Sequence, residues 1–266
     1  MGKYYDAKFC REAYEKYQDF AERVWAGYKF YARGSSVIRK GFENAGVAIH
    51  ADDSLDYAAT FYRRSESDLE HQAKTAWLAL VFMANLPWYF GGERYYTVPI
   101  DIWLRYNISL THDSGEVEIG DIMDDDNPDH KTKDKAELEA FQKILIAYPE
   151  VYRQEATRLF KAFQKKTTRE GMAIAALDKL DAIFTNLCLE KCGLRGSIYD
   201  KPHPTELDIH YAEKYGSDAS ADVWCARMLD CTAKDFPPDI MEPIIAVIIA
   251  ASLDVRGKEL ACVRMS

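Results

Sequence analysis

Apolar residues recur at helical spacing along most of the chain. Between residues 5 and 32 they form one stripe of mainly aromatic side chains, namely Ala13, Tyr17, Phe20, Val24, Tyr28 and Tyr31. Residues three and four apart lie on the same face of a helix, so this stripe predicts a long amphipathic helix. Similar patterns predict helices at residues 37–47, 52–62, 67–85, 100–111, 133–148, 149–166, 169–192, 206–215, 219–233 and 238–255. No segment shows a convincing strand pattern, so the expected fold class is all-α.

The segment at residues 169–192 is apolar on almost every face, which is typical of a helix buried in the core. Thr167 and Glu170 have the spacing of a capping box and predict where this helix begins. Asp178 lies in its middle, where an ionised carboxylate is costly unless it is paired or bound to a metal. Asp181 falls on a nearby face, whereas Lys179 is expected to point elsewhere. Because an arginine or backbone donors could also satisfy Asp178, both interpretations stay open.

The composition limits the classes of protein to consider. The 266 residues are enough for a large domain with an extension, and 48% of them are hydrophobic. The net charge of −9 argues against nucleic-acid binding, which needs a basic face. The first residues lack the apolar stretch of a signal peptide, and residues 244–251, the longest apolar run, are far fewer than the ~20 of a membrane span. Six cysteines without a CxxC pair fit a reducing cytosol, so we expect a cytoplasmic protein without a membrane partner.

The C-terminal segment Met241–Leu253 is strongly apolar. Such a surface must be covered, either by the core of the same chain or by another molecule. The second alternative would make the protein a homodimer through this segment.

Candidate chemistry is concentrated where the predicted helix at residues 100–111 ends. His112 and Asp113 are adjacent there, and Glu116 and Asp121 follow within nine residues. An imidazole beside a carboxylate is a typical ligand pair for a divalent metal, and the further acids could move the protons of a water molecule. His71 lies in the first turn of the helix predicted from residue 67, on one stripe with core residues. It could therefore be an ordinary core histidine instead of a ligand.

These residues occur in the order H…HD…D along the chain. The segments that carry the pattern are Ser65-Glu-Ser-Asp-Leu-Glu-His71, His112-Asp-Ser-Gly-Glu116, Gly120-Asp121 and Leu177-Asp-Lys-Leu180. Together they resemble the HD-domain metal phosphohydrolases, and most closely the HD-domain 5′-deoxynucleotidase-like subgroup. The resemblance covers roughly residues 35–190. It implies a helical HD-type core at residues 35–195. The rest of the chain lies outside the resemblance, and its helical patterns predict an N-terminal helix at 1–34 that packs on the core and a C-terminal helical extension at 196–266.

The resemblance also implies roles for individual residues. His71, His112, Asp113 and Asp178 would bind one divalent metal ion, and such a nitrogen and oxygen set suits Mn, Co, Fe, Ni, Zn or Mg. Glu116 would handle the attacking water, which the metal activates, and Asp121 would be the second catalytic acid. Arg64 and Lys74 would meet the phosphate of the substrate. The metal would also explain how an acidic protein holds an anionic small molecule.

The expected activity is hydrolysis of a nucleoside 5′-monophosphate or a similar small phosphomonoester. Two departures from related enzymes bear on this. Asp56-Tyr57 stands where bacterial deoxynucleotidases have an Arg-Trp pair that contacts sugar and phosphate, so the sequence does not support a preference for deoxyribose. Glu116-Val117 stands where alarmone hydrolases have Glu-Asp, which argues against that activity. The alternatives are a nucleoside triphosphate or pyrophosphate hydrolase, a non-catalytic metal-binding scaffold or regulatory protein, and a plain helical bundle whose polar residues are unrelated.

Overall fold

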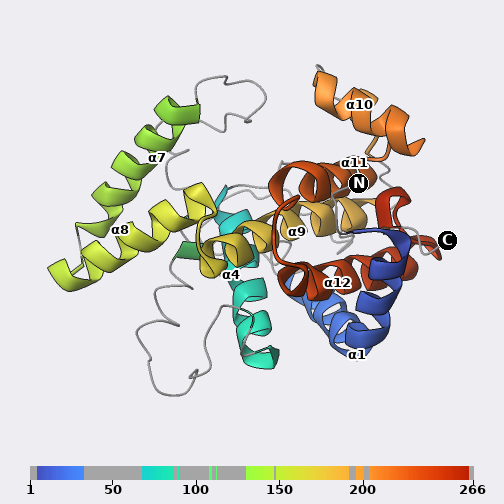
Figure 1. The fold of residues 1–266 in the computed structure, drawn as a ribbon, viewed down its shortest axis with the longest axis horizontal. Helices are drawn as coiled ribbons and strands as arrows, with labels where there is room; N and C mark the ends of the chain where they lie inside the picture. The colour runs from blue at the N-terminus through green and yellow to red at the C-terminus, as the bar shows by residue number, and fades with distance from the viewer. Residues whose placement is uncertain are drawn as a thin grey trace, which may run out of the picture.

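A computed structural model describes residues 5–32, 68–86, 89, 108–109, 112, 130–146, 148–191, 196–200 and 204–263. Within these ranges the fold is all-α, as predicted, and the one β-type pairing is an isolated antiparallel bridge between Ser197 and Ala219. The α-helices, drawn in Figure 1, are α1 (Ala7–Ala32), α4 (Asp68–Asn85), α7 (His130–Leu145), α8 (Glu150–Lys165), α9 (Arg169–Lys191), α10 (Glu206–Tyr215), α11 (Ser220–Arg227) and α12 (Pro238–Arg256). The helices predicted at residues 37–47 and 52–62, and most of that at 100–111, lie outside the described residues.

The shorter elements lie in the C-terminal part of the chain. They are the 3-10 turns Ile198–Asp200 and Ala261–Val263 and a π-helical turn, Met228–Thr232. The π turn follows α11 directly, so the helix predicted at 219–233 is an α-helix only in its first half.

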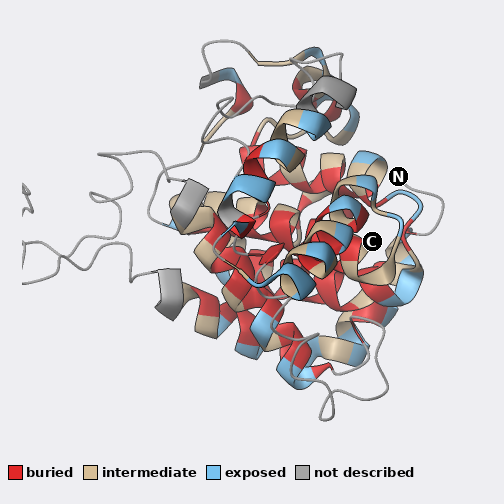
Figure 2. Cartoon of the chain, turned by 90° about the vertical axis from the view of Figure 1, so that its left-hand side faces the viewer, coloured by how far each residue is buried: buried red, intermediate tan, exposed pale blue. Residues whose placement is uncertain are grey.

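Helix α9 runs through the middle of the molecule (Figure 1) and is buried along most of its length. Buried residues gather toward the inside of the helix assembly, and exposed residues lie on its outer faces (Figure 2). It packs against α4, α8, α11 and α12, so no side of it is left wholly to solvent. The prediction of a buried central helix is therefore confirmed. Because α9 meets so many neighbours, a polar side chain on it can reach groups delivered by several other helices.

The first and last long helices pack along each other at one end of the molecule (Figure 1). Trp25 and Tyr28 of α1 each place their ring edge-on, 4.8 Å from that of Phe184 on α9. The Asp254 carboxylate of α12 accepts hydrogen bonds from Trp25 Nε1 at 2.9 Å and from two lysines, one on α1 and one on α9. The apolar segment of α12 is buried within the chain, which is the first of the two alternatives for it. A homodimer stays a prediction.

Helices α8 and α9 approach each other closely at their junction. Lys166 has a left-handed φ of 51°, and the Thr168 hydroxyl accepts a hydrogen bond of 3.2 Å from Gly171 N. The residue that caps α9 is therefore Thr168, and the prediction of Thr167 is wrong by one position. A Cβ atom on Gly171 would lie 2.3 Å from the carbonyl oxygen of Ala162, so only glycine fits this helix contact.

Candidate metal centre

His71 and Asp178 meet because the first turn of α4 packs against the middle of α9. Helix α4 begins at Asp68, which places His71 in its first turn, as the sequence predicts. Asp178 is only 8% exposed, and its Oδ1 lies 2.9 Å from His71 Nε2. The carboxylate in the middle of the buried helix is thus met by a side chain from another helix.

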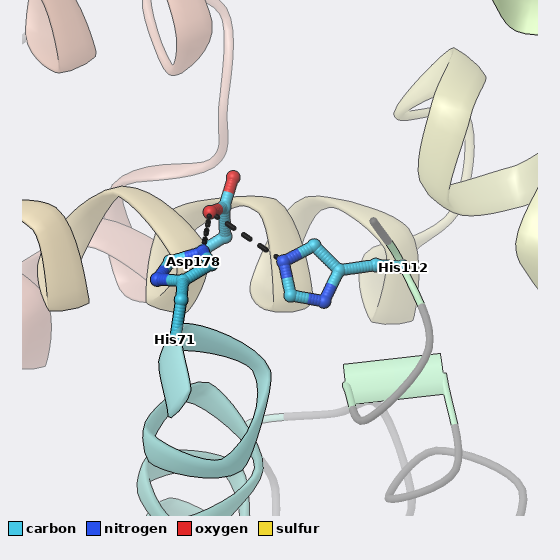
Figure 3. A group of neighbouring side chains, drawn as sticks. All are labelled: His71, His112 and Asp178. Atoms are coloured by element: carbon cyan, nitrogen blue, oxygen red, sulfur yellow. Dashed lines mark hydrogen bonds and ion pairs between the residues drawn. The ribbon is translucent and has the colours of Figure 1, made fainter. Parts of the chain in front are cut away.

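His112 reaches the same carboxylate from a third segment (Figure 3). Its ring is buried, and its Nε2 lies 3.6 Å from Asp178 Oδ1. One ligand atom from each of His71, His112 and Asp178 lies within 4.8 Å of the other two. In the part of the chain that the structure describes, no other group of three histidine, cysteine or acidic side chains is as close. The structure therefore brings together three of the four predicted ligands.

The second nitrogen of each imidazole faces an oxygen acceptor. His112 Nδ1 donates to the carbonyl oxygen of Ser109 at 3.0 Å, and His71 Nδ1 donates to Asp181 Oδ2 at 2.6 Å. A hydrogen bond of this kind fixes the proton on Nδ1 and leaves Nε2 as the nitrogen that can bind a metal. Both Nε2 atoms face Asp178, so the donor set fits a divalent cation.

The charges of the site are consistent with this fit. Burial lowers the pKa of His71, but hydrogen bonds to Asp178 and Asp181 outweigh burial and hold that pKa well above its ordinary value. Burial raises the pKa of Asp178, but Lys179 and the two imidazoles outweigh it and hold that pKa well below its ordinary value. Each ring nitrogen of His71 thus faces a carboxylate oxygen. A metal ligand must be deprotonated, so a bound cation would take the place of the Nε2 proton.

Several predicted site residues lie outside the described residues. They are the fourth ligand, Asp113, the two catalytic acids, Glu116 and Asp121, and one phosphate contact, Arg64. Their roles stay predictions.

Lys74, the other predicted phosphate contact, is buried beside Asp181. Its Nζ donates to Thr185 Oγ1 at 2.7 Å and lies 3.5 Å from Asp181 Oδ2. Its surroundings are those of a side chain inside the protein, and its role toward a substrate stays a prediction.

The contacts of two residues near Asp178 differ from, or go beyond, what the sequence predicts. Lys179 does not point away from Asp178, because its Nζ lies 3.0 Å from Asp178 Oδ2. A four-carbon side chain can bend back to its neighbour, which helix geometry at Cβ alone does not reveal. Asp181 is fully buried and is the partner of His71. Its spacing of three residues from Asp178 was the available signal, since such residues share a helix face.

Comparison with known proteins identifies the class to which this centre belongs. A family model described as HD domain matches residues 58–201, more than half of the chain and a range that includes His71, His112 and Asp178. The HD superfamily is one of metal-dependent phosphohydrolases, and the possible metal site of His71, His112 and Asp178 lies within the matched range. The chain belongs to the HD domain family.

Other comparisons add no closer relative. No curated protein and no solved structure matches the chain. Among the helices of the described ranges, none combines the length and the apolar character needed to cross a membrane.

Proposed function

We propose that the protein is a metal-dependent phosphohydrolase that releases the phosphate of a nucleoside 5′-monophosphate or a similarly small phosphomonoester, in the manner of the 5′-deoxynucleotidase-like subgroup. The observation that carries the proposal is the convergence of His71, His112 and Asp178, with both Nε2 atoms turned toward one carboxylate. A divalent cation held there would offset the charge of a phosphoryl group and make water more acidic.

The charge distribution favours a small anionic substrate over a polyanion. The chain has a net charge of −9, so attraction for phosphate must come from the site itself. Lys179 is suited to this, because its ammonium lies beside Asp178 and its side chain is 35% exposed. We infer that Lys179 contacts the phosphate, while Lys74 has a structural role as the partner of Asp181 and Thr185. Arg64 stays a candidate for a second phosphate contact.

The remaining steps are assigned to residues by resemblance. Asp113 would be the fourth ligand, Glu116 would accept the proton of the attacking water, and Asp121 would orient or protonate the reacting groups. The nitrogen and oxygen donors give Mn, Co, Fe, Ni, Zn or Mg as candidates for the ion, and they suit the first five best.

Phosphate release from a panel of nucleotides tests the proposal. The full chain is stripped with a chelator, reloaded with Mn²⁺ or Co²⁺, and given ribo- and deoxyribonucleoside mono- and triphosphates. We expect inorganic phosphate from monophosphates, no release by His112→Ala, and a Glu116→Ala variant that keeps its metal but loses turnover. Lys179→Ala should raise KM more than it lowers kcat.

The other outcomes separate the alternatives. Release of pyrophosphate or triphosphate would instead place the enzyme among the polyphosphate hydrolases. Wild-type release no greater than that of His112→Ala, with metal still bound by the wild type, would favour a non-catalytic scaffold.

A further inference from the structure

The Asp181 carboxylate of α9 is fully buried and is held by side chains from two other helices, α1 and α4. It accepts a hydrogen bond from His71 Nδ1 of α4 on Oδ2, and one from the Tyr28 hydroxyl of α1 on Oδ1, both of 2.6 Å. The ammonium of Lys74 lies 3.5 Å from Oδ2. Each carboxylate oxygen therefore has a donor on a different helix, and the plane of the carboxylate is fixed.

The Tyr28 side chain is itself held rigidly. It is completely buried, its ring packs edge-on against Phe184 and Trp77, and its hydroxyl lies 3.3 Å from Thr185 Oγ1. A side chain so constrained can fix the direction of the group that it contacts. Residue 28 lies outside residues 58–201, the range matched by the HD domain family.

We propose that Asp181 is a positioning residue for His71 and that Tyr28 holds Asp181 in place, so that the affinity of the centre for its cation depends on helix α1. The inference rests on the metal centre of the proposed function. Asp181 keeps the His71 proton on Nδ1 and the ring turned so that Nε2 faces Asp178. Tyr28 fixes the other oxygen of the same carboxylate and so limits the rotation of the pair.

Hydrogen bonds to the far nitrogen of a ligand histidine affect metal affinity strongly. Loss of such a partner typically weakens metal binding by about 10–100-fold. Asp181→Asn keeps the size of the side chain, but its amide can present an NH₂ group to Nδ1 and so favour the tautomer that has its proton on Nε2. We expect weakening in this range for Asp181→Asn. Tyr28→Phe leaves Asp181 in place and removes one of its donors, so we expect a smaller loss than for Asp181→Asn, about threefold to tenfold.

Tyr5→Phe is a matched control for Tyr28→Phe. Tyr5 is also completely buried, and its hydroxyl donates to the carbonyl oxygens of Ala233 and Phe236, away from Asp181. Both variants lose one buried hydroxyl near α1 and should lose similar stability. Of the two tyrosines, only Tyr28 donates a hydrogen bond to Asp181, the partner of His71 Nδ1.

The test is titration of the full-length, metal-free protein and its variants with Mn²⁺. Electron paramagnetic resonance measures the free ion at each step and so gives the affinity for Mn²⁺. Absorption spectra of the Co²⁺ forms report the geometry of the ligands. We expect weaker Mn²⁺ binding and an altered Co²⁺ spectrum for Tyr28→Phe and Asp181→Asn, with Tyr5→Phe like the wild type. Unchanged affinity in Tyr28→Phe, or an equal loss in Tyr5→Phe, would overturn the inference. A wild type that binds neither ion would overturn the metal centre itself, which is a different result.

Discussion

Replacement of Gly171 by alanine tests the contact that sets α8 against α9. In a helix interior, alanine is normally favoured over glycine by about 1 kcal/mol. Here the added Cβ would lie 2.3 Å from Ala162 O and 2.7 Å from Ala162 C, both backbone atoms of the neighbouring helix. No rotamer can relieve this contact, so the helices must separate by about 1 Å, and overpacking of a core costs about 1–3 kcal/mol. We expect a net loss of about 1 kcal/mol, which is the cost of overpacking less the gain in helix propensity.

Urea denaturation followed by circular dichroism measures this loss, and Gly27→Ala is the matched control. Gly171 lies in the first turn of α9 and Gly27 inside α1, but a Cβ atom on Gly27 would meet only the side chain of Trp77, at 3.0 Å. A side chain can shift where a backbone cannot, so Gly27→Ala should be much closer to neutral.

Gly171→Ala should also disturb the metal centre. The ring of Phe163, near the end of α8, packs edge-on against the ring of His112 with 5.4 Å between their centroids. Displacement of α8 should therefore weaken Mn²⁺ binding by Gly171→Ala. A Gly171→Ala protein as stable as the wild type would refute the account of the helix contact.

Three further predictions concern the metal, a helix cap and an ion pair. Mn²⁺ at about a hundred times its Kd should stabilise the wild type by ~2.7 kcal/mol in thermal denaturation, and His112→Ala should lose this gain. Thr168→Ala should cost about 1 kcal/mol in urea denaturation, because the cap of α9 is lost. Asp254→Asn should cost at most about 1 kcal/mol at pH 7, because the carboxylate is 38% exposed and water screens it. Hydrogen bonds from two lysines and an indole outweigh burial and hold the pKa of Asp254 below its ordinary value, so its contribution is complete above the unfolded pKa of about 4 and is lost at lower pH.

Each of these has its own control. An equal Mn²⁺ effect on His112→Ala would show that the ion binds elsewhere. Thr167→Ala should leave the free energy of unfolding nearly unchanged. A larger loss of stability for Thr167→Ala than for Thr168→Ala would show that Thr167 is the cap, as the sequence predicts. For Asp254→Asn, a difference from the wild type that persists unchanged at pH 2 would contradict the assignment to an ionised carboxylate.

The helices could be predicted from sequence because their signal is local. The ends of α10 agree with the sequence prediction, and the burial of α9 follows from its apolar residues on every face. The sequence does not show which residue caps α9, because the adjacent residues Thr167 and Thr168 carry the same hydroxyl group. In the structure Lys166 has a left-handed conformation and Thr168 is the cap.

The site could be predicted only as far as a sequence pattern describes it. The order of His71, His112 and Asp178 indicated that they meet, and they do. The partnership of Asp181 with His71 and Tyr28 depends on how three helices cross, and nothing in the spacing of residues 28, 71 and 181 records that crossing. Local patterns define elements, whereas the supporting hydrogen bonds of a site arise from tertiary packing.

The packing of α1 along α12 has a consequence for synthesis of the chain. The two helices are separated by residues 33–237, so α12 leaves the ribosome long after α1. At usual translation rates this interval lasts roughly 10–40 s. Throughout that time the face of α1 that α12 will cover lacks its partner helix. Early protection by a chaperone would suit this protein better than folding from the N-terminus as synthesis proceeds.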